Sequence, residues 1–267
     1  MKTNPGNRVT RPPRSIRGWR LRRYASLDST NNEGLRLAEA GAIEGPTLIL
    51  ADSQTEGRGR GSNAWWSDEG SLLFTLVFEP RLRGIATDRE PLVALAGARA
   101  LVRGLGPWMR SQPSIRWPND VEVEGRKLAG LLCEAADGPD GDFLLLGVGV
   151  NVETSFDEAP ADVRARATTL AEIAGNLLAV RGARWRRLRA LLAFLDEFDE
   201  ALDALADPPR FAELFDLHDA LRDRPVRIRQ GDRIVTGVGR GIEPDGALRL
   251  ETAEGIIPIY GGQVLDS

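Results

Sequence analysis

Short, continuous apolar runs recur along the first 150 residues of the chain, each bounded by Gly, Pro or polar residues. Runs of this length without helical spacing are typical of strands buried inside a sheet. We therefore expect one sheet built from residues 19–25, 47–51, 72–78, 114–117, 121–123, 127–134 and 143–150. The Glu124-Gly125 pair predicts a hairpin between the fifth and sixth of these segments.

Apolar residues at helical spacing predict helices among these strands and after them. The helical segments are 29–40, 90–106, 184–206 and 210–220, and Pro208-Pro209 are expected to end the third one. Asp28, Ser29, Thr30 and Asn31 precede the first helix, and residues of these types favour helix N-caps. Capping alone would therefore explain them. Strands mixed with helices in this order predict an α+β fold.

The pattern changes from about Arg222 onward. Short alternating segments are separated by glycines every few residues, which predicts a small all-β barrel. We place a domain boundary near residue 220, between a larger domain over 24–219 and a smaller one over 220–267.

Charge is distributed unevenly along the 267 residues. Residues 1–23 hold eight Lys and Arg residues and no acid, whereas the whole chain has a formal charge of -4. We interpret this Pro- and Arg-rich segment as a flexible tail, because it has too few apolar residues to bury a core. It is either a solvated leader or a contact for nucleic acid or an acidic partner.

The single cysteine, Cys133, and the single histidine, His218, exclude several kinds of site. A disulfide within the chain and a zinc centre need more of these residues, and a Ser-His-Asp triad is not credible with this one histidine. We take His218 as an ordinary packing residue. No apolar run approaches the ~18 residues that span a bilayer. We therefore expect no membrane association and a cytoplasmic location.

The segment Ser53 to Trp66 is the strongest functional candidate. Gly57, Gly59 and Gly61 alternate with Arg58 and Arg60 directly after a predicted strand. Such a loop can wrap an anion with its amides and guanidinium groups. The alternative is a basic linker, although a strand on one side and Trp65-Trp66 on the other argue against it. The two tryptophans either wall a pocket or pack in the core.

Two further charged residues complete a set suited to adenylation. Lys127 follows the hairpin turn, and Asp120 follows Trp117-Pro118-Asn119. An attacking carboxylate is already ionised near pH 7, so that reaction needs cationic groups to hold two anions and no general base. Magnesium would bridge the phosphates. Other phosphate-handling functions remain compatible with the same residues.

Five motifs resemble, in order, the successive motifs of biotin protein ligases. They are Asp28-Ser29-Thr30-Asn31, Gln54 to Gly61, Trp117-Pro118-Asn119-Asp120, Arg126 to Gly130 and Gly147 to Asn151, spread over about 125 residues. The β segment at 222–267 resembles the SH3-like C-terminal domain of that family. The resemblance implies a mixed-sheet catalytic domain flanked by helices, shared with lipoate ligases and related to class II synthetases.

The resemblance also implies a reaction and a partner. Biotin and ATP would give biotinyl-5′-AMP and pyrophosphate, with Mg2+ as the metal. The acyl group would then pass to a lysine of a biotin carboxyl carrier domain. The enzyme would be a monomer or a homodimer. Only about 23 residues precede the catalytic domain, so we expect no helix-turn-helix, no repressor activity and no sequence-specific nucleic acid binding.

The family's site residues carry over to matching positions of this sequence. Lys127, Arg58 and Asp120 would be catalytic, with Asp120 orienting magnesium or the incoming lysine. Biotin and ATP would be bound by Ser29, Thr30, Asn31, Gln54, Gly57, Arg58, Gly59, Arg60, Lys127, Gly130 and Asn151.

Two departures from the family pattern concern the ATP side of the site. Gly61-Ser62-Asn63-Ala64 stand where further basic residues are usual, and residues 152–170 contain no tryptophan to stack on adenine. Two alternatives stay open. A lipoate or octanoate transferase shares the catalytic fold but not the GRGRG run, and a biotin-responsive DNA-binding regulator would use the basic tail.

Overall fold

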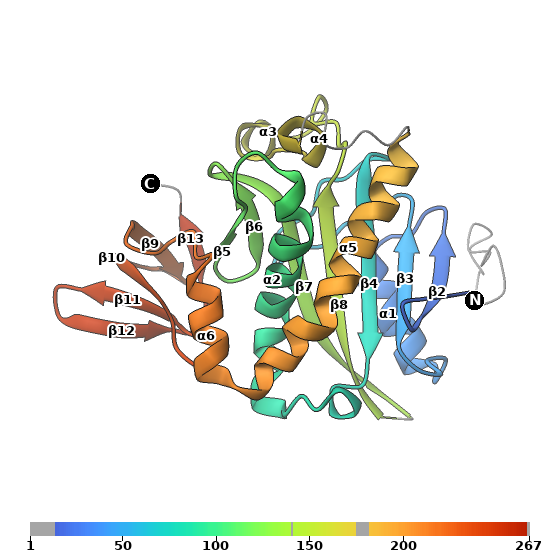
Figure 1. Cartoon of the computed structure of the whole chain (residues 1–267), viewed down its shortest axis with the longest axis horizontal. Coiled ribbons are helices and arrows are strands. Elements are labelled where there is room, and N and C mark those ends of the chain that lie inside the picture. Colours follow the sequence, from blue (N-terminus) through green and yellow to red (C-terminus); the bar gives the residue numbers. More distant parts are fainter. Residues whose placement is uncertain (1–13, 140, 175–181, 266–267) are drawn as a thin grey trace.

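The computed structural model describes residues 14–139, 141–174 and 182–265 and places them in two sheets with flanking helices (Figure 1). The larger sheet has eight strands in the order β1-β2-β3-β4-β8-β7-β6-β5. Only β2 and β3 are parallel, and the other neighbours are antiparallel. The strands are β1 (Arg14–Ile16), β2 (Trp19–Tyr24), β3 (Thr47–Ala51), β4 (Ser71–Phe78), β5 (Ser114–Arg116), β6 (Asp120–Val123), β7 (Arg126–Gly138) and β8 (Gly141–Asn151).

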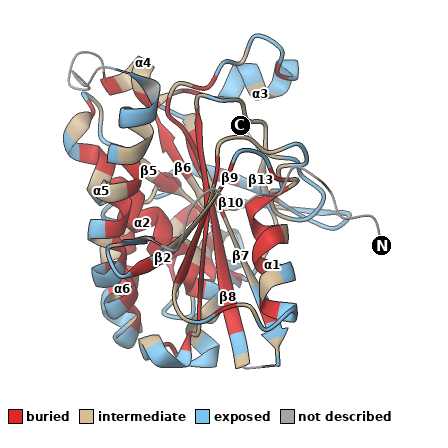
Figure 2. Cartoon of the chain, turned by 90° about the vertical axis from the view of Figure 1, so that its right-hand side faces the viewer, coloured by how far each residue is buried: buried red, intermediate tan, exposed pale blue. Residues whose placement is uncertain are grey.

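Helices cover both faces of this sheet (Figure 2). On one face α1 (Thr30–Glu39) packs against β3, β4, β7 and β8. On the other face α2 (Val93–Leu105) packs against β7, and α5 (Ala183–Asp203) packs against β4 and α2. Two short helices, α3 (Ala161–Arg166) and α4 (Leu170–Ala174), follow β8.

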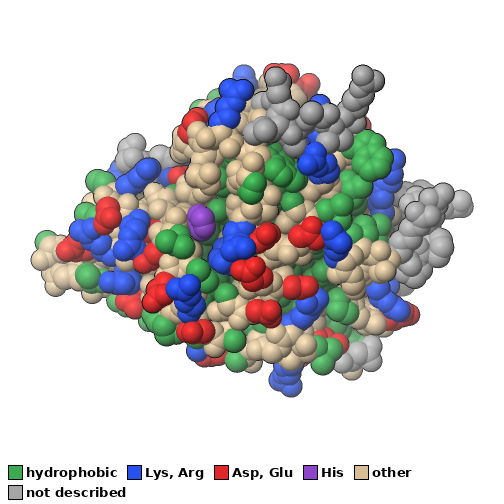
Figure 3. Space-filling view, in the orientation of Figure 1, with side chains coloured by type: hydrophobic (Ala, Val, Ile, Leu, Met, Phe, Trp, Pro, Cys, Tyr) green, Lys and Arg blue, Asp and Glu red, His purple; other side chains and the backbone are tan. Residues whose placement is uncertain are grey.

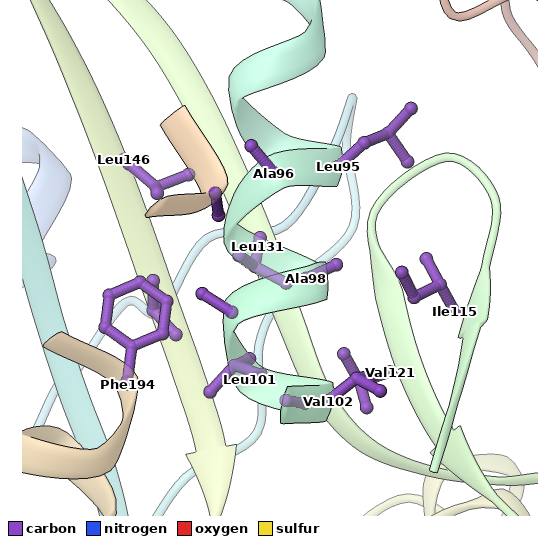
Figure 4. Packing of buried hydrophobic residues seen from close by; sticks show 14 of the residues in the cluster. Leu95, Ala96, Ala98, Leu101, Val102, Ile115, Val121, Leu131, Leu146 and Phe194 are labelled. Atoms are coloured by element: carbon purple, nitrogen blue, oxygen red, sulfur yellow. The ribbon is translucent and has the colours of Figure 1, made fainter. Parts of the chain in front are cut away.

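The sheet separates two hydrophobic cores. The larger one lies under α2 and α5, where Leu131 and Leu146 of the sheet meet α2 and Phe194 of α5 (Figure 4). The smaller core lies under α1 and includes Tyr24 and Leu145. All eight residues of β4 are buried, as expected for a central strand covered on both faces.

The smaller sheet is antiparallel, with the order β12-β11-β10-β9-β13. Its strands are β9 (Pro225–Gln230), β10 (Arg233–Ile242), β11 (Leu248–Thr252), β12 (Gly255–Ile259) and β13 (Gln263–Leu265). Helix α6 (Pro208–Asp216) precedes this sheet and packs against β10. The expected α+β fold with a small C-terminal β domain is confirmed.

The interpretation of residues 1–23 as a flexible tail is wrong for its second half. Residues 14–23 form β1 and most of β2, and Trp19 is buried at 1% exposure. Three arginines of this segment pair with acids elsewhere in the chain. Arg17 pairs with Asp196, and Arg23 with Asp52 at 2.7 Å. Residues 1–13 lie outside the described part.

The prediction for residues 208–220 is wrong in two details. Pro208 and Pro209 begin α6, because proline lacks only an N–H that the first helical turn does not use. The Asp207 side chain accepts a hydrogen bond from Arg210 N at this start. His218 lies beyond the helix, where its carbonyl oxygen accepts from Ile115 N at 2.7 Å. Residues 217–220 thus run beside the edge strand β5.

No helix in the described ranges is long and apolar enough to cross a membrane.

Candidate functional site

A cleft of about 580 Å3 opens beside the Gly-Arg loop and brings the five motifs together. All of the predicted site residues except Gly57 line it. They come from the start of α1, the loop after β3, and strands β6, β7 and β8, as the lining residues Thr30, Arg60, Asp120, Lys127 and Asn151 illustrate. Residues more than 100 positions apart therefore meet in one cleft.

The floor of the cleft is a pair of glycines that face each other across β7 and β8. Gly130 and Gly149 are register partners, and the Trp65 indole lies on them. A Cβ at Gly149 would lie 2.5 Å from Trp65 Cε2, so this position requires glycine. The buried Trp65 Nε1 has no hydrogen-bond partner among the described residues and remains available as a donor.

Ser29 and Thr30 are more than helix caps. Ser29 occupies the N-cap position of α1, yet its side chain makes no capping hydrogen bond and lines the cleft. Gln54 Oε1 accepts from both Thr30 N, at 2.7 Å, and Thr30 Oγ1, at 3.0 Å. These polar groups are therefore fixed at one end of the cleft before any ligand arrives.

Asn31 lines the cleft and also links two strands of the sheet through its side-chain hydrogen bonds. Its Oδ1 accepts from Thr75 Oγ1 at 2.6 Å, and its Nδ2 donates to Glu134 Oε2 at 2.8 Å. A Cβ at Gly147 would lie 2.2 Å from Asn31 Oδ1. Asn31 and Trp65 thus approach the backbone of β8 closely, at Gly147 and Gly149 respectively.

The Gly-Arg loop is tied to the sheet by Arg58. Its Nη2 lies 2.5 Å from Glu134 Oε1, and its Nη1 donates to Asn32 at 2.8 Å. Within the loop, Gly59 N donates to Asn63 O, and Trp65 N donates to Gly57 O. Gly57 supports the loop from outside the cleft, because a Cβ there would lie 2.6 Å from Trp65 O.

Lys127, Asp120 and Arg60 form the charged centre. Lys127 Nζ lies 2.8 Å from Asp120 Oδ2 and 5.4 Å from the centre of the Trp65 ring. Asp120 Oδ1 is buried and has no hydrogen-bond partner in the described chain. Burial lowers the pKa of Arg60, whereas the attraction of Asp120 raises it. Arg60 nevertheless stays charged at neutral pH, since arginine begins far above it.

A chain of buried polar groups holds the backbone of Lys127. Asn151 Nδ2 donates to Lys127 O at 3.3 Å, and Thr168 N donates to the same oxygen at 3.0 Å. Thr154 Oγ1 donates to Asn151 Oδ1 at 3.3 Å and lies 2.9 Å from Ser71 Oγ. Asn151 thus lines the cleft and also holds the backbone carbonyl of Lys127 in place.

Several lining residues were not found from the sequence. They are Arg116, Glu122 and Phe156, the α3 residues Asp162, Val163 and Arg166, and Gly262, Gln263 and Val264 near the C-terminus. The first two lie close to the Trp-Pro-Asn-Asp motif, which is a usable signal. The contribution of residues 262–264 has no local signal, because it depends on how the small β domain packs.

The cleft fits a magnesium ion that arrives with a nucleotide. Magnesium is usually held by one or two carboxylates together with phosphate oxygens. Asp120 offers one buried, unpartnered oxygen, whereas no cluster of three or more His, Cys, Asp or Glu residues occurs in the described ranges. Asp120 is therefore the residue that would hold the ion.

The chain combines a cleft lined by Arg58, Arg60 and Lys127 on a mixed sheet with a small antiparallel β domain, and both parts match protein ligases of the biotin/lipoate type. The Biotin/lipoate A/B protein ligase family model matches residues 24–151, and the Biotin protein ligase C terminal domain model matches residues 223–265.

Relatives and solved structures agree with this class. The biotin--[acetyl-CoA-carboxylase] ligase of Paracoccus denitrificans is 33% identical over 89% of this chain and 99% of its own length. The bifunctional ligase/repressor BirA of Bacillus subtilis is 31% identical over 93% of this chain and 74% of its own. The biotin protein ligase of Aquifex aeolicus, solved with biotin and ATP, is 30% identical, with a TM-score of 0.74 over 92% of this chain and 97% of its own. The chain belongs to the biotin protein ligases of this family and is a ligase enzyme.

Proposed function

We propose that this ligase activates biotin with ATP as biotinyl-5′-AMP and transfers the biotinyl group to a lysine of a biotin carboxyl carrier domain. One observation carries the proposal: the cations Lys127, Arg58 and Arg60 line the same cleft as the uncharged polar residues Ser29, Thr30, Asn31 and Gln54. Biotin offers a group for each kind of residue, with a polar ureido head, an apolar middle and a carboxylate at the tail.

The polar end would receive the ureido ring. The Ser29 hydroxyl makes no capping hydrogen bond, and Gln54 Oε1 accepts a hydrogen bond from the neighbouring Thr30 N. The Trp65 ring on the glycine floor would cover the apolar part of biotin. The carboxylate would then point toward Lys127, next to the place where the α-phosphate must lie.

The first half-reaction needs charge stabilisation. A biotin carboxylate oxygen attacks the α-phosphorus of ATP, the bond to the bridging oxygen breaks, and pyrophosphate leaves. Lys127, Arg58 and Arg60 would neutralise the negative charge that gathers on the α-phosphate. Magnesium, held by Asp120, would supply further charge neutralisation to the phosphates. Arg58 and Lys127 must exchange their present partners, Glu134 and Asp120, for the ligand.

The second half-reaction transfers the acyl group. The ε-amine of the carrier lysine attacks the acyl carbon, AMP leaves with the bonding electron pair, and the amine loses a proton. Asp120 would orient that amine, since its Oδ1 has no hydrogen-bond partner among the described residues. We further propose a cytoplasmic enzyme without repressor activity, in which the catalytic residues act as implied by the family motifs.

A substrate assay tests the proposal directly. The purified chain is incubated with ATP and a carrier domain, with either biotin or lipoate as the acid, and the mass of the carrier is measured. We expect a gain of one biotinyl group and no lipoylation. Lipoylation without biotinylation would move the protein to the lipoate transferases.

A gel shift tests the absence of repressor activity. The full chain and a variant lacking residues 1–13 are mixed with genomic DNA fragments at physiological salt, with and without biotin. We expect no sequence-specific binding by either protein. A saturable, biotin-dependent complex with one fragment would overturn this part, since unspecific binding weakens as salt rises.

A further inference from the structure

Three polar side chains, spaced four residues apart, gather at the start of α1. They are Asp28, Asn32 and Arg36. Arg36 donates from Nη1 and Nη2 to the two oxygens of Asp28, at 3.0 and 2.8 Å. Asn32 Nδ2 donates to Asp28 Oδ2 at 3.0 Å. Because residues four apart lie on the same side of a helix, this spacing lets Asp28 accept from both of the later residues.

Asp28 is the fixed point of this group. The hydrogen bonds from Arg36 hold the pKa of the Asp28 carboxyl well below its usual range, and the bond from Asn32 acts in the same direction. Asp28 is therefore ionised at neutral pH. Arg36 also donates to Glu33 Oε2 at 3.0 Å, and buried Tyr24 donates to Glu33 Oε1 at 2.8 Å. The network thus joins the start of α1 to the end of β2.

Asn32 links this network to the Gly-Arg loop. Its Nδ2 faces Asp28, and its Oδ1 accepts from Arg58 Nη1 at 2.8 Å. These neighbours leave one orientation for the amide, because a carboxylate can only accept and an arginine can only donate. Asn32 itself is half-buried and does not line the cleft. Its connection to the site therefore runs through Arg58.

The guanidinium group of Arg58 has two partners of different charge. Nη1 faces the neutral Asn32, whereas Nη2 lies 2.5 Å from Glu134 Oε1. Glu134 is in turn held by Asn31, whose Nδ2 donates to Oε2 at 2.8 Å. When a ligand anion takes the place of Glu134 at Nη2, the bond to Asn32 can stay. A neutral partner also leaves the charge of Arg58 available to that anion.

We propose that Asn32 is a positioning residue of this ligase, which holds Arg58 Nη1 while Nη2 passes from Glu134 to the reacting anion. This inference rests on the proposed adenylation, in which Arg58 neutralises charge on the α-phosphate. Because the guanidinium fork is rigid and planar, fixing Nη1 limits where Nη2 can point. A donor held in place before reaction stabilises the developing charge without a cost of reorganisation.

Three variants separate the hydrogen bond from the charge. Asn32→Leu has nearly the shape of asparagine and loses both side-chain hydrogen bonds. Asn32→Asp keeps an acceptor for Arg58, but it neutralises the charge of that arginine and repels Asp28. Glu39→Leu is the control, because Glu39 is exposed on the same helix and does not line the cleft.

The first measurement follows the Gly-Arg loop without substrate. The full ligand-free chain is treated with trypsin, and cleavage after Arg58 or Arg60 is timed by mass spectrometry. We expect Asn32→Leu to be cleaved several times faster than wild type, because the loop has lost a tie to α1. Asn32→Asp should be cleaved no faster than wild type, since a charged acceptor holds Arg58 at least as tightly. A wild-type cleavage rate in Asn32→Leu would overturn the proposal.

The second measurement is biotin-dependent ATP–pyrophosphate exchange. We expect both Asn32 variants to lower kcat by about tenfold with a smaller change in KM for biotin, and Glu39→Leu to stay within about twofold of wild type. Because the loop is still held in Asn32→Asp, its loss of kcat reports the neutralised charge of Arg58. A wild-type kcat in Asn32→Asp would overturn the need for a neutral partner.

The two measurements together distinguish a failure of this role from a failure of the proposed adenylation. Faster cleavage of Asn32→Leu, with no exchange by any of the proteins, would reject the proposed function and keep Asn32 as the anchor of Arg58. Exchange by wild type with an equal kcat in Asn32→Leu would keep the proposed function and reject the role of Asn32.

Discussion

The side-chain amine of Lys127 lies 2.8 Å from Asp120 Oδ2 and 5.4 Å from the centre of the Trp65 ring. A carboxylate and an aromatic face thus hold the ammonium group over the glycine floor before substrate binds. The Lys127 side chain already lines the cleft. It can therefore exchange Asp120 Oδ2 for a phosphate oxygen of the ligand.

Lys127→Ala should remove adenylation while leaving the fold intact. We expect the rate of biotinyl-AMP formation to fall by about 100-fold or more, since a preorganised charge at the reacting phosphate is lost. The thermal midpoint should barely change, because the lysine side chain is 39% exposed. The control is Arg126→Ala, which removes the neighbouring cation. Arg126 pairs with Glu172, and neither of the two residues lines the cleft. A wild-type rate in Lys127→Ala would remove its assigned role.

Glu134→Gln should loosen the Gly-Arg loop. The glutamine can still accept from Asn31, but it no longer carries the charge that pairs with Arg58. We expect trypsin to cleave after Arg58 or Arg60 several times faster in the variant. Biotin and ATP should restore protection in both proteins. An unchanged cleavage rate would mean that the ion pair does not order the loop.

Thr154→Val should impair catalysis through Lys127 without touching the ligand. Valine cannot donate to Asn151 Oδ1 or bond Ser71, so Asn151 loses the contact that orients its amide toward Lys127 O. We expect kcat of adenylation to fall about tenfold, with a smaller change in KM for biotin.

Thr154→Ser keeps the hydroxyl and is the matched control for that experiment. It should recover most of the lost kcat. If serine and valine lower kcat equally, the hydroxyl has no positioning role, and the effect of the valine variant comes from packing alone.

Asp219→Asn should change how stability depends on pH. Burial raises the pKa of Asp219 from 3.8 to about 6, with further repulsion from Asp216 and Asp223 and attraction from Arg222. The folded chain holds this proton more tightly than the unfolded chain. The free energy of unfolding therefore falls as pH rises from about 4 to about 6.

Asparagine keeps the acceptor for Leu221 N and removes the buried charge. We expect the variant to be more stable than wild type at pH 7 by about 1 to 3 kcal/mol, with the difference shrinking toward pH 4. Urea unfolding at both pH values measures it. A difference that is the same at pH 4 and pH 7 would show that the charge of Asp219 is not the cause.

Much of the fold follows from local signals in the sequence. The apolar runs predict β2, β3, β4 and β8 to within a few residues, because buried strands need such runs. The motif residues come from the start of α1, from loops and from strands that line one cleft, which explains why short motifs identify the site.

The remaining features depend on contacts between distant residues. The residues directly before β2 look like part of a tail until Asp196 is placed beside Arg17. Glu134 becomes a partner of Arg58 only when β7 lies beside the loop. Gln263 enters the cleft only because the C-terminal domain packs against its mouth. No periodicity in the sequence encodes these distances.

The most direct test of the central claim is ATP–pyrophosphate exchange by the purified chain, with and without biotin. The account predicts exchange that requires biotin and is lost in Lys127→Ala. Exchange supported by lipoate instead of biotin, or no exchange with either acid, would contradict it.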